Sequence, residues 1–276
     1  MKRMRILGLA LVAVFAVVAI TAGAASAKPT WKECTNKGFE KNTGNYSDKS
    51  CTTKVGGTGK YELKAGIGKG KGFKGKGGEA SLHNVIPGKG DIKVTCASFK
   101  DAGSVVAPSG VAKVTAEFKK CKSLGAPCKT EGGKKETVTT KSMAGSLGYL
   151  NKAHTAAGQS LTSEAEPGTG YLAEFECEGL AKVRVHGAVI GTLSPFNVVS
   201  KESTSTFAVG PYLGELAPGY TPLVNPPAFE EGAEPVGVLL TELNGPETGN
   251  VWAPEGGLPS GLEGTAENKG ESLGVS

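Results

Sequence analysis

Apolar and polar residues alternate with a period of two along much of this chain. In one stretch Val114, Ala116 and Phe118 alternate with Thr115 and Glu117. This period is that of a half-buried β-strand, whose successive side chains point to opposite faces. The clearest stretches are Ile92–Phe99, Val111–Cys121, Tyr171–Cys177 and Leu180–Ile190, and shorter candidates are Tyr61–Ala65, Glu136–Thr140, Ser146–Leu150, Thr204–Val209, Val236–Glu242 and Gly270–Val275.

No stretch after residue 27 keeps a helical period, and the 42 glycines suit many short strands joined by turns. We therefore predict an all-β fold, an antiparallel β-sandwich or jelly-roll-like single domain over residues 28–276.

Two segments interrupt the pattern of alternating residues. Gly66–Gly78 is rich in Lys and Gly and predicts a flexible loop, whereas 211–235 holds six prolines and predicts a long surface excursion.

Residues 1–27 have the order of a secretory signal peptide. Lys2, Arg3 and Arg5 precede an apolar run from Ile6 to Ile20, and the segment ends in small residues. This order predicts a signal helix, cleavage after Ala27 and a secreted, extracellular protein. No later segment is long and apolar enough to cross a membrane, so we expect no transmembrane segment after cleavage.

Six cysteines in an exported chain indicate disulfides, for which 15 connectivities exist. Proximity in the sequence favours Cys34 with Cys51, across a polar loop, and Cys121 with Cys128, across a Gly/Pro turn. Cys96 and Cys177 then remain, each in a strand-like run. The prediction is therefore 34–51, 121–128 and 96–177. No Cys-x-x-Cys pair and no clustered histidines occur, so no metal site and no cofactor is predicted.

Charge is divided unevenly along the chain. Residues 28–160 carry 24 Lys and 10 acidic residues, whereas residues 161–276 carry 3 Lys, 1 Arg and 16 Glu. Two interpretations are open: the halves neutralise each other in one body, or a basic face binds an anionic polymer of the cell wall or an acidic polysaccharide. The candidate binding residues are Lys69, Lys71, Lys74 and Lys76. Nucleic acid is not expected, because the basic half lacks arginine and its lysine-rich segment has one aromatic residue.

Motifs associated with catalysis match weakly. The run from Gly70 to Gly75 fits G-x-G-x-x-G, but no strand–helix context is predicted around it. Ser146 lies in a relaxed nucleophile-elbow pattern, but of the downstream histidines only His186 follows a glutamate, and it lies on a polar strand face. No predicted helix follows Ser146. Glu174 and Glu176 alternate outward beside basic residues of the next strand, which favours cross-strand ion pairs over glycoside hydrolysis. His83, His154 and His186 are scattered and are expected at the surface. No catalytic residue is predicted.

The stretch Phe175–Ser200 resembles a segment of uncharacterised exported proteins of soil actinobacteria. The pattern Cys34…Tyr46-x-Asp48-x-x-Cys51, Cys96 in a Val-Thr-Cys strand and Leu147-Gly148-Tyr149 fit as well. The resemblance covers most of the mature chain, and its motifs are structural. It implies export, a disulfide-braced β fold and one domain, and it implies no substrate.

Three functions remain open at this point. The first is a secreted, non-enzymatic β protein at the cell envelope or outside the cell that binds anionic polymers through its lysine-rich face. The second is an extracellular hydrolase acting on polysaccharide or ester. The third is a passive structural or assembly component.

Overall fold

The computed structural model describes residues 28–36, 42–65, 71–86, 90–106, 108–167, 169–208, 229–230, 239–249 and 251–275. The predicted signal peptide and all but two residues of the proline-rich excursion lie outside these ranges. Within them the fold is nearly all β, and its strands pair antiparallel. The one helical element described is a 3₁₀ turn, η1 (Pro246–Thr248). In the described ranges no helix has the length and apolar character needed to cross a membrane.

The strands are β1 (Trp31–Thr35), β2 (Gly44–Tyr46), β3 (Lys54–Gly59), β4 (Glu62–Ala65), β5 (Lys71–Gly77), β6 (Ala80–Ile86), β7 (Gly90–Cys96), β8 (Ser98–Val106), β9 (Gly110–Lys119), β10 (Lys122–Ser123), β11 (Ala126–Lys129), β12 (Thr137–Thr139), β13 (Met143–Tyr149), β14 (Ala157–Ser163), β15 (Tyr171–Cys177), β16 (Ala181–Ser194), β17 (Ser200–Phe207), β18 (Leu239–Asn244) and β19 (Ala253–Val275).

Strand pairing closes on itself twice. Ring 1 runs β5–β8–β9–β13–β14–β16–β17–β19 and returns to β5. Ring 2 runs β6–β7–β10–β11–β15–β16–β18–β19 and returns to β6. A closed ring leaves no unpaired sheet edge, so every backbone donor and acceptor along it can find a partner.

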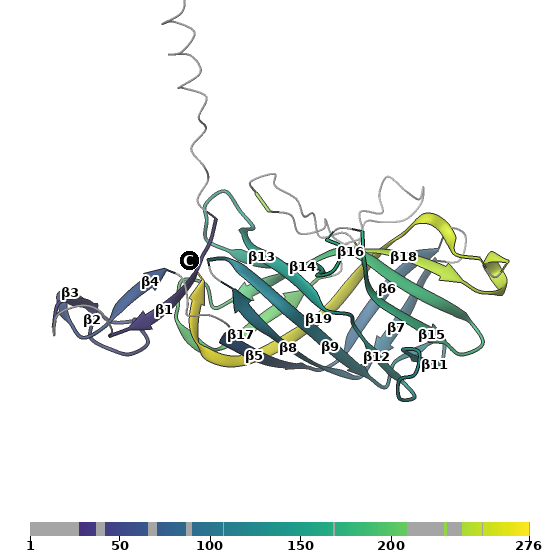
Figure 1. Cartoon of the computed structure of the whole chain (residues 1–276), viewed down its shortest axis with the longest axis horizontal. Helices are drawn as coiled ribbons and strands as arrows, with labels where there is room; N and C mark the ends of the chain where they lie inside the picture. Colours follow the sequence, from purple (N-terminus) through teal and green to yellow (C-terminus); the bar gives the residue numbers. More distant parts are fainter. Residues whose placement is uncertain are drawn as a thin grey trace, which may run out of the picture.

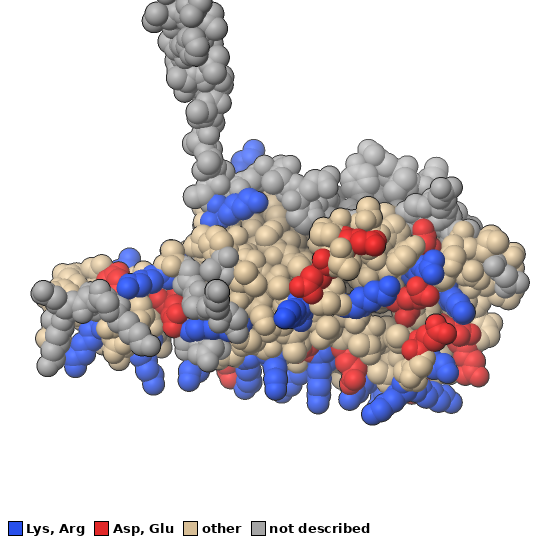
Figure 2. All heavy atoms as spheres, viewed as in Figure 1, with Lys and Arg blue, Asp and Glu red and all other residues tan. Residues whose placement is uncertain are grey.

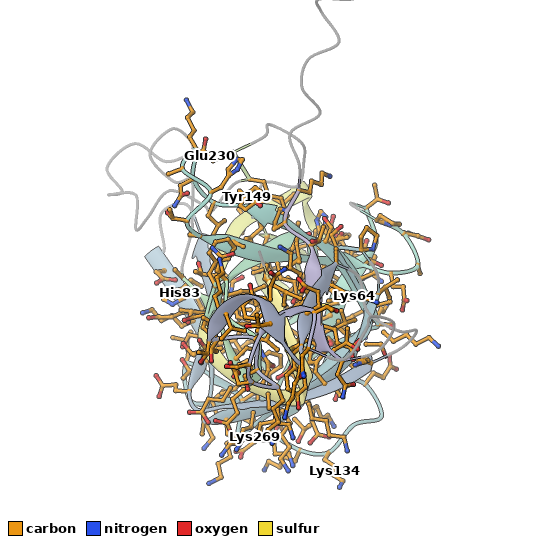
Figure 3. All side chains as sticks on the ribbon, turned by 90° about the vertical axis from the view of Figure 1, so that its left-hand side faces the viewer. Lys64, His83, Lys134, Tyr149, Glu230 and Lys269 are labelled. Atoms are coloured by element: carbon orange, nitrogen blue, oxygen red, sulfur yellow. A yellow bond between two sulfur atoms is a disulfide. The ribbon has the colours of Figure 1, made fainter. Side chains whose placement is uncertain are left out.

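The two rings lie end to end because β16 and β19 run through both. The first part of β16 pairs with β15 and β18 in ring 2, and its last part pairs with β14 and β17 in ring 1. Figure 1 shows the resulting elongated body, with β19 crossing it obliquely in yellow. Figure 3 looks along the long axis of this body. The sandwich or jelly-roll arrangement predicted from the sequence is not confirmed.

A small extension projects from the ring 1 end of the body. Strand β1 pairs with the end of β19 and with β4, and β2 and β3 form a separate two-stranded sheet beyond them (Figure 1). Trp31 anchors the extension, because its side chain is buried in the core and its indole Nε1 donates to the Gly110 carbonyl oxygen at 3.0 Å. The disulfide between Cys34 and Cys51 joins β1 to the loop before β3.

Most of the period-two stretches form strands close to the predicted bounds. Ile92–Phe99 is divided between β7 and β8, and Gly270–Val275 is the end of the 23-residue β19. Tyr171–Cys177 is β15, and the predicted turn at Glu178-Gly179 joins it to β16, with Gly179 at a φ of 72°. Two bulges change which side chains point inward. Lys113 has a φ of 54°, so Val111 as well as Val114 is buried, and a register shift at Leu172 buries that side chain beside Ala173.

The prediction of a flexible loop over Gly66–Gly78 is wrong for its second part. Lys71–Gly77 is strand β5, paired on one side with β8 and on the other with β19. Its inward glycines leave room for neighbouring side chains. A Cβ on Gly77 would lie 2.1 Å from the Phe99 ring, and one on Gly75 would lie 2.1 Å from Asp101 Oδ1. The glycines that suggested flexibility therefore allow close packing inside the ring.

The predicted 34–51 disulfide is confirmed, and the other two pairings are wrong. The structure joins Cys96 to Cys121 and Cys128 to Cys177, each with Cα atoms 4.0 Å apart. Cys128 and Cys177 are register partners on β11 and β15. Cys121 lies next to Lys122, which pairs with Thr95 on β7, so it faces Cys96. Sequence proximity favoured the turn closure 121–128, and the Cys128 N–H does donate to the Cys121 carbonyl oxygen at 2.9 Å. Each of these two cysteines, however, also has a cysteine opposite it on the strand at its other side, and the disulfides form there.

We expect a tryptic digest without reduction to report these pairings directly. The peptide Val94–Lys100 should be linked to Cys121–Lys122, and Ser123–Lys129 to Ala153–Lys182. As an internal control, Glu33–Lys37 should be linked to Ser50–Lys54. A link between Cys121–Lys122 and Ser123–Lys129 would show that the turn closure is the true pairing and would contradict the 96–121 and 128–177 disulfides.

Candidate functional site

Lysines from five adjacent strands or loops gather on the outer face of ring 1. Figure 2 shows basic side chains in a row along the lower edge of the body, and Figure 3 places Lys134 and Lys269 at this edge. Neighbouring strands lie about 4.8 Å apart, so the set spans roughly 20 Å across β19, β5, β8, β9 and the loop before β12. We define the lysine patch as Lys74, Lys76, Lys100, Lys119, Lys134 and Lys269.

Strand register brings like charges directly opposite each other in this patch. Lys74 pairs with Lys269 across β5 and β19, and Lys76 pairs with Lys100 across β5 and β8. The outward direction of these side chains follows from the alternation of β5, whose Phe73 points into the core. Like charges at directly opposed positions destabilise a sheet. On their other sides Lys76, Lys100 and Lys269 lie opposite Glu267, Glu117 and Glu202, so part of this repulsion is offset.

Acidic residues border the patch and offset part of its charge. Lys269 Nζ lies 2.8 Å from Glu202 Oε1, and Lys119 Nζ lies 3.0 Å from Glu117 Oε1. The hydrogen bond from Lys119 and the nearby charges lower the pKa of Glu117, as the bond from Lys269 lowers the pKa of Glu202. These exposed pairs are screened by solvent and salt. Among the described residues, Lys74 and Lys100 have no carboxylate within ion-pair distance.

Few ion pairs join the two charged halves of the sequence within the part of the chain that the structure describes. Of the Lys and Arg ion pairs among the described residues, one joins the two halves, between Lys76 Nζ and Glu267 Oε2 at 3.8 Å. The others form within a half: 71–33, 93–91, 119–117 and 122–136 in the first, and 184–174 and 269–202 in the second. Among the described residues, the two halves therefore share one Lys–Glu ion pair, at the border of the lysine patch.

The four lysines proposed from the sequence do not act as one group. Lys69 lies outside the described residues. Lys71 Nζ lies 2.6 Å from Glu33 Oε1 and is largely buried, so it ties β5 to β1. Lys74 and Lys76 belong to the patch. Sequence reasoning missed their partners Lys100, Lys119, Lys134 and Lys269, because β5, β8 and β19 become neighbours through ring closure, which no local pattern reports.

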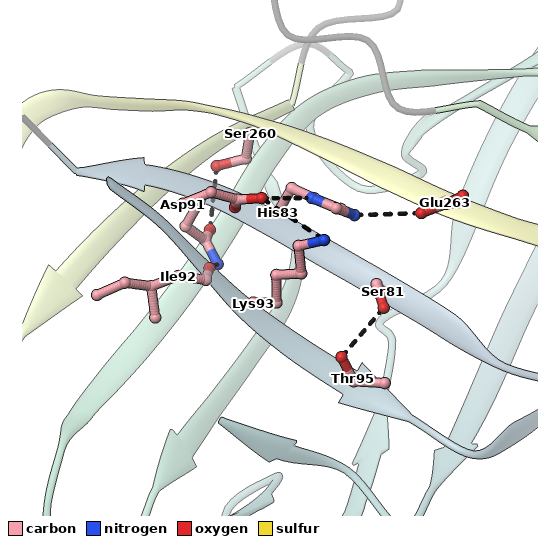
Figure 4. A network of polar contacts seen from close by, with 9 residues as sticks. Ser81, His83, Asp91, Ile92, Lys93, Thr95, Ser260 and Glu263 are labelled. Carbon is pink, nitrogen blue, oxygen red and sulfur yellow. Dashed lines mark hydrogen bonds and ion pairs between the residues drawn. The ribbon is translucent and has the colours of Figure 1, made fainter. Parts of the chain in front are cut away.

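His83 forms the most connected polar cluster of ring 2, and its predicted surface position is wrong. Its ring is 4% exposed, with Nδ1 2.8 Å from Asp91 Oδ2 and Nε2 3.3 Å from Glu263 Oε2 (Figure 4). Lys93 Nζ lies 3.8 Å from the same Asp91 oxygen. The cluster joins β6, β7 and β19, and both ring nitrogens are engaged by carboxylates. We interpret it as a brace between strands.

The remaining candidates for catalysis have structural roles. Ser146 lies within β13, and its backbone N–H donates to Ser160 Oγ, so the strand-to-helix turn of a nucleophile elbow is missing there. The predicted cross-strand ion pair is confirmed between Arg184 Nε and Glu174 Oε2 at 2.8 Å. His154 is exposed and stacks on Tyr149. In the described part of the chain, no three His, Cys, Asp or Glu side chains converge as a metal site.

A cavity of about 130 Å³ lies inside the rings, and most of its wall is apolar. Three polar side chains stand at one side of it: Asp101 from β8, Ser205 from β17 and Asn268 from β19. A second cavity of about 60 Å³, lined by Trp31 and Val275 among others, shares Asn268 and Ser205 with the first. The polar group therefore stands where the two cavities meet.

Two oxygens of this polar group lack a hydrogen-bond partner. Asn268 Nδ2 donates to Ser205 Oγ at 2.9 Å, whereas Asn268 Oδ1 and Asp101 Oδ1 are buried without a partner. Both oxygens lie beside Gly75, 2.4 Å and 2.1 Å from where its Cβ would be. Burial raises the pKa of Asp101 to about 6. A carboxyl group here costs free energy when it ionises, so packing alone does not explain it.

Comparisons with known protein families, with curated proteins and with solved structures found no match for this chain. The resemblance to exported proteins of soil actinobacteria stays a prediction. Functional inference therefore depends on the side chains of this molecule.

The raised pKa of Asp101 predicts a specific pH dependence. Because the folded protein holds this proton up to about pH 6 and the unfolded chain releases it near pH 4, the folded state loses stability as pH rises between these values. The free energy of unfolding of wild type relative to Asp101→Asn should fall by about 1–3 kcal/mol from pH 4 to pH 7. Urea titrations at each pH measure this difference.

Asp48 provides a control with the opposite sign. Backbone N–H groups of Thr53, Thr52 and Ser50 lower its pKa to about 2. Its stabilisation is therefore complete above the unfolded pKa and is lost as pH falls toward 2. The free energy of unfolding of wild type relative to Asp48→Asn should therefore rise with pH between about pH 2 and about pH 4. A difference between wild type and Asp101→Asn that stays constant from pH 4 to pH 7 would contradict the assignment for Asp101.

Proposed function

We propose that this protein is a secreted, non-enzymatic β protein that binds anionic polymers at the cell envelope or outside the cell through the lysine patch. The observation that carries the proposal is the direct opposition of Lys74 to Lys269 and of Lys76 to Lys100. Such pairs cost stability in the free protein. A polyanion laid across the strands would place its negative charges between them and relieve this repulsion.

The chemistry of the patch favours a diffuse, repeating anion over a single small ligand. Lysine ammonium groups are strongly hydrated point charges that attract phosphate or carboxylate without fixing its orientation. The patch is broad and exposed, with Lys76 67% and Lys269 66% accessible. A wall polymer with phosphate groups or an acidic polysaccharide presents charges along a chain, so several lysines can act at once.

Export is part of the proposal and has its own support. The first 27 residues have the order of a signal peptide. The three disulfides are compatible with folding in an oxidising compartment. In a protein cleaved after Ala27, the lysine patch would supply a point of attachment to an anionic envelope.

Removal of three patch lysines should abolish polyanion binding. The variant Lys74→Gln/Lys76→Gln/Lys100→Gln removes both opposed pairs, and the control Lys54→Gln/Lys60→Gln/Lys152→Gln removes the same charge from exposed positions elsewhere. Retention on immobilised polyphosphate and on polygalacturonate is measured at 50 and 200 mM NaCl. Wild type and control should be retained, with affinity falling about tenfold or more at the higher salt. The patch variant should bind at least about tenfold more weakly at low salt.

The outcomes separate the proposal from its alternatives. Preference for polyphosphate indicates a phosphate-bearing wall polymer, and preference for polygalacturonate indicates an acidic polysaccharide. Equal losses in the two triple variants would show that net charge alone determines retention. The absence of salt-sensitive retention of wild type on both matrices would contradict the proposal and favour a passive structural role.

A further inference from the structure

The interior of the rings carries a second candidate site, independent of the lysine patch. Eight antiparallel strands enclose a space that side chains either fill or leave large enough for one small ligand. Here the wall includes Phe99, Val114, Leu161 and Val189, and a cavity of about 130 Å³ remains. An apolar cavity of roughly 150 Å³ in another protein admits benzene. The space is therefore suited to one six-membered ring.

The polar group of Asp101, Ser205 and Asn268 determines which hydrogen-bonding group one end of such a ligand must carry. Asn268 is 9% exposed, and its amide nitrogen is already used by Ser205, so its free oxygen can only accept a hydrogen bond. Asp101 Oδ1 lies beside it, also without a partner. An unpaired buried acceptor costs about 1–3 kcal/mol, so a ligand donor that reaches these oxygens recovers free energy that an apolar ligand cannot.

The second cavity adjoins this position, and the exposed residues Lys201 and Lys269 are among those that line it. It lies toward the Trp31 end of ring 1 and shares Phe73, Gln159, Ser205 and Asn268 with the main cavity. The polar oxygens therefore stand at the junction of the two spaces, with the larger apolar space on the other side. A ligand that enters here can place its ring in the larger cavity and keep its donor at the junction.

We infer that the cavity binds a small, mostly apolar molecule of about the size of one aromatic ring that carries a single neutral hydrogen-bond donor, accepted by Asn268 Oδ1 and Asp101 Oδ1. Phenols and ring alcohols belong to this class. An anionic ligand is disfavoured by the Asp101 carboxyl group and by the apolar wall, and a cationic ligand would lose its hydration on entering this wall. The inference adds a small-molecule site inside the protein to the polymer-binding face proposed on its outside.

Phenol and toluene form a matched pair of probes, because they differ in a hydroxyl against a methyl group at nearly equal size. Binding to the full mature chain is followed at pH 7.5 by methyl NMR of the cavity-lining Val114, Leu161, Val185 and Val189. We expect phenol to shift these signals and to bind at least about tenfold more tightly than toluene. Equal affinity for the two probes, or no shift with either, overturns the inference.

Two variants test where the hydroxyl group and the aromatic ring of the bound probe lie. Asn268→Leu removes the buried acceptor at similar volume and should reduce the preference for phenol at least about fivefold while toluene still binds. Ala116→Leu fills part of the cavity and should weaken the binding of both phenol and toluene. A retained preference for phenol in Asn268→Leu overturns the assignment of the acceptor. If either variant fails to fold, contacts between phenol protons and these methyl groups in wild type decide, and their absence overturns the inference.

Discussion

The structure depends on the antiparallel pairing of β19 with strands from both ends of the chain. This strand pairs with β5 and β17 to close ring 1 and with β6 and β18 to close ring 2. Closure removes the sheet edges and encloses the core of both rings. It also places Lys269, from the acidic half of the sequence, directly opposite Lys74 from the basic half. The outer patch and the inner cavity are both consequences of this one strand.

Strand β5 contributes to both the lysine patch and the cavity, one from each of its two faces. Its outward lysines contribute to the patch, and its inward Gly75 and Gly77 leave space for Asp101, Asn268 and the Phe99 ring. A larger inward residue would displace these side chains from the interior. The alternation of Lys and Gly in this segment therefore satisfies two requirements at once: charge on the solvent side and small volume on the core side.

Local pattern was sufficient to predict many of the strands, although not β5, β6 or β14, and it was insufficient to predict which strands pair. The alternation around Val114 and the turn at Gly179 depend on neighbouring residues and were interpreted correctly. The pairing of Cys128 with Cys177 depends on which strands become neighbours, and proximity in the sequence pointed to Cys121 instead. For the same reason the patch was predicted only in part, and the interior pair of Asp101 and Asn268, far apart in sequence, was missed.

Both the lysine patch and the cavity require Lys71–Gly77 to be a strand held between β19 and β8. Amide hydrogen exchange of this segment measures this directly, because a strand with partners on both sides has its N–H groups hydrogen-bonded. We expect the amides of Phe73, Lys74 and Gly75 to exchange as slowly as those of β8 and β9. Exchange at the rate of an unstructured Lys/Gly segment would contradict the ring 1 closure, and with it the lysine patch and the cavity.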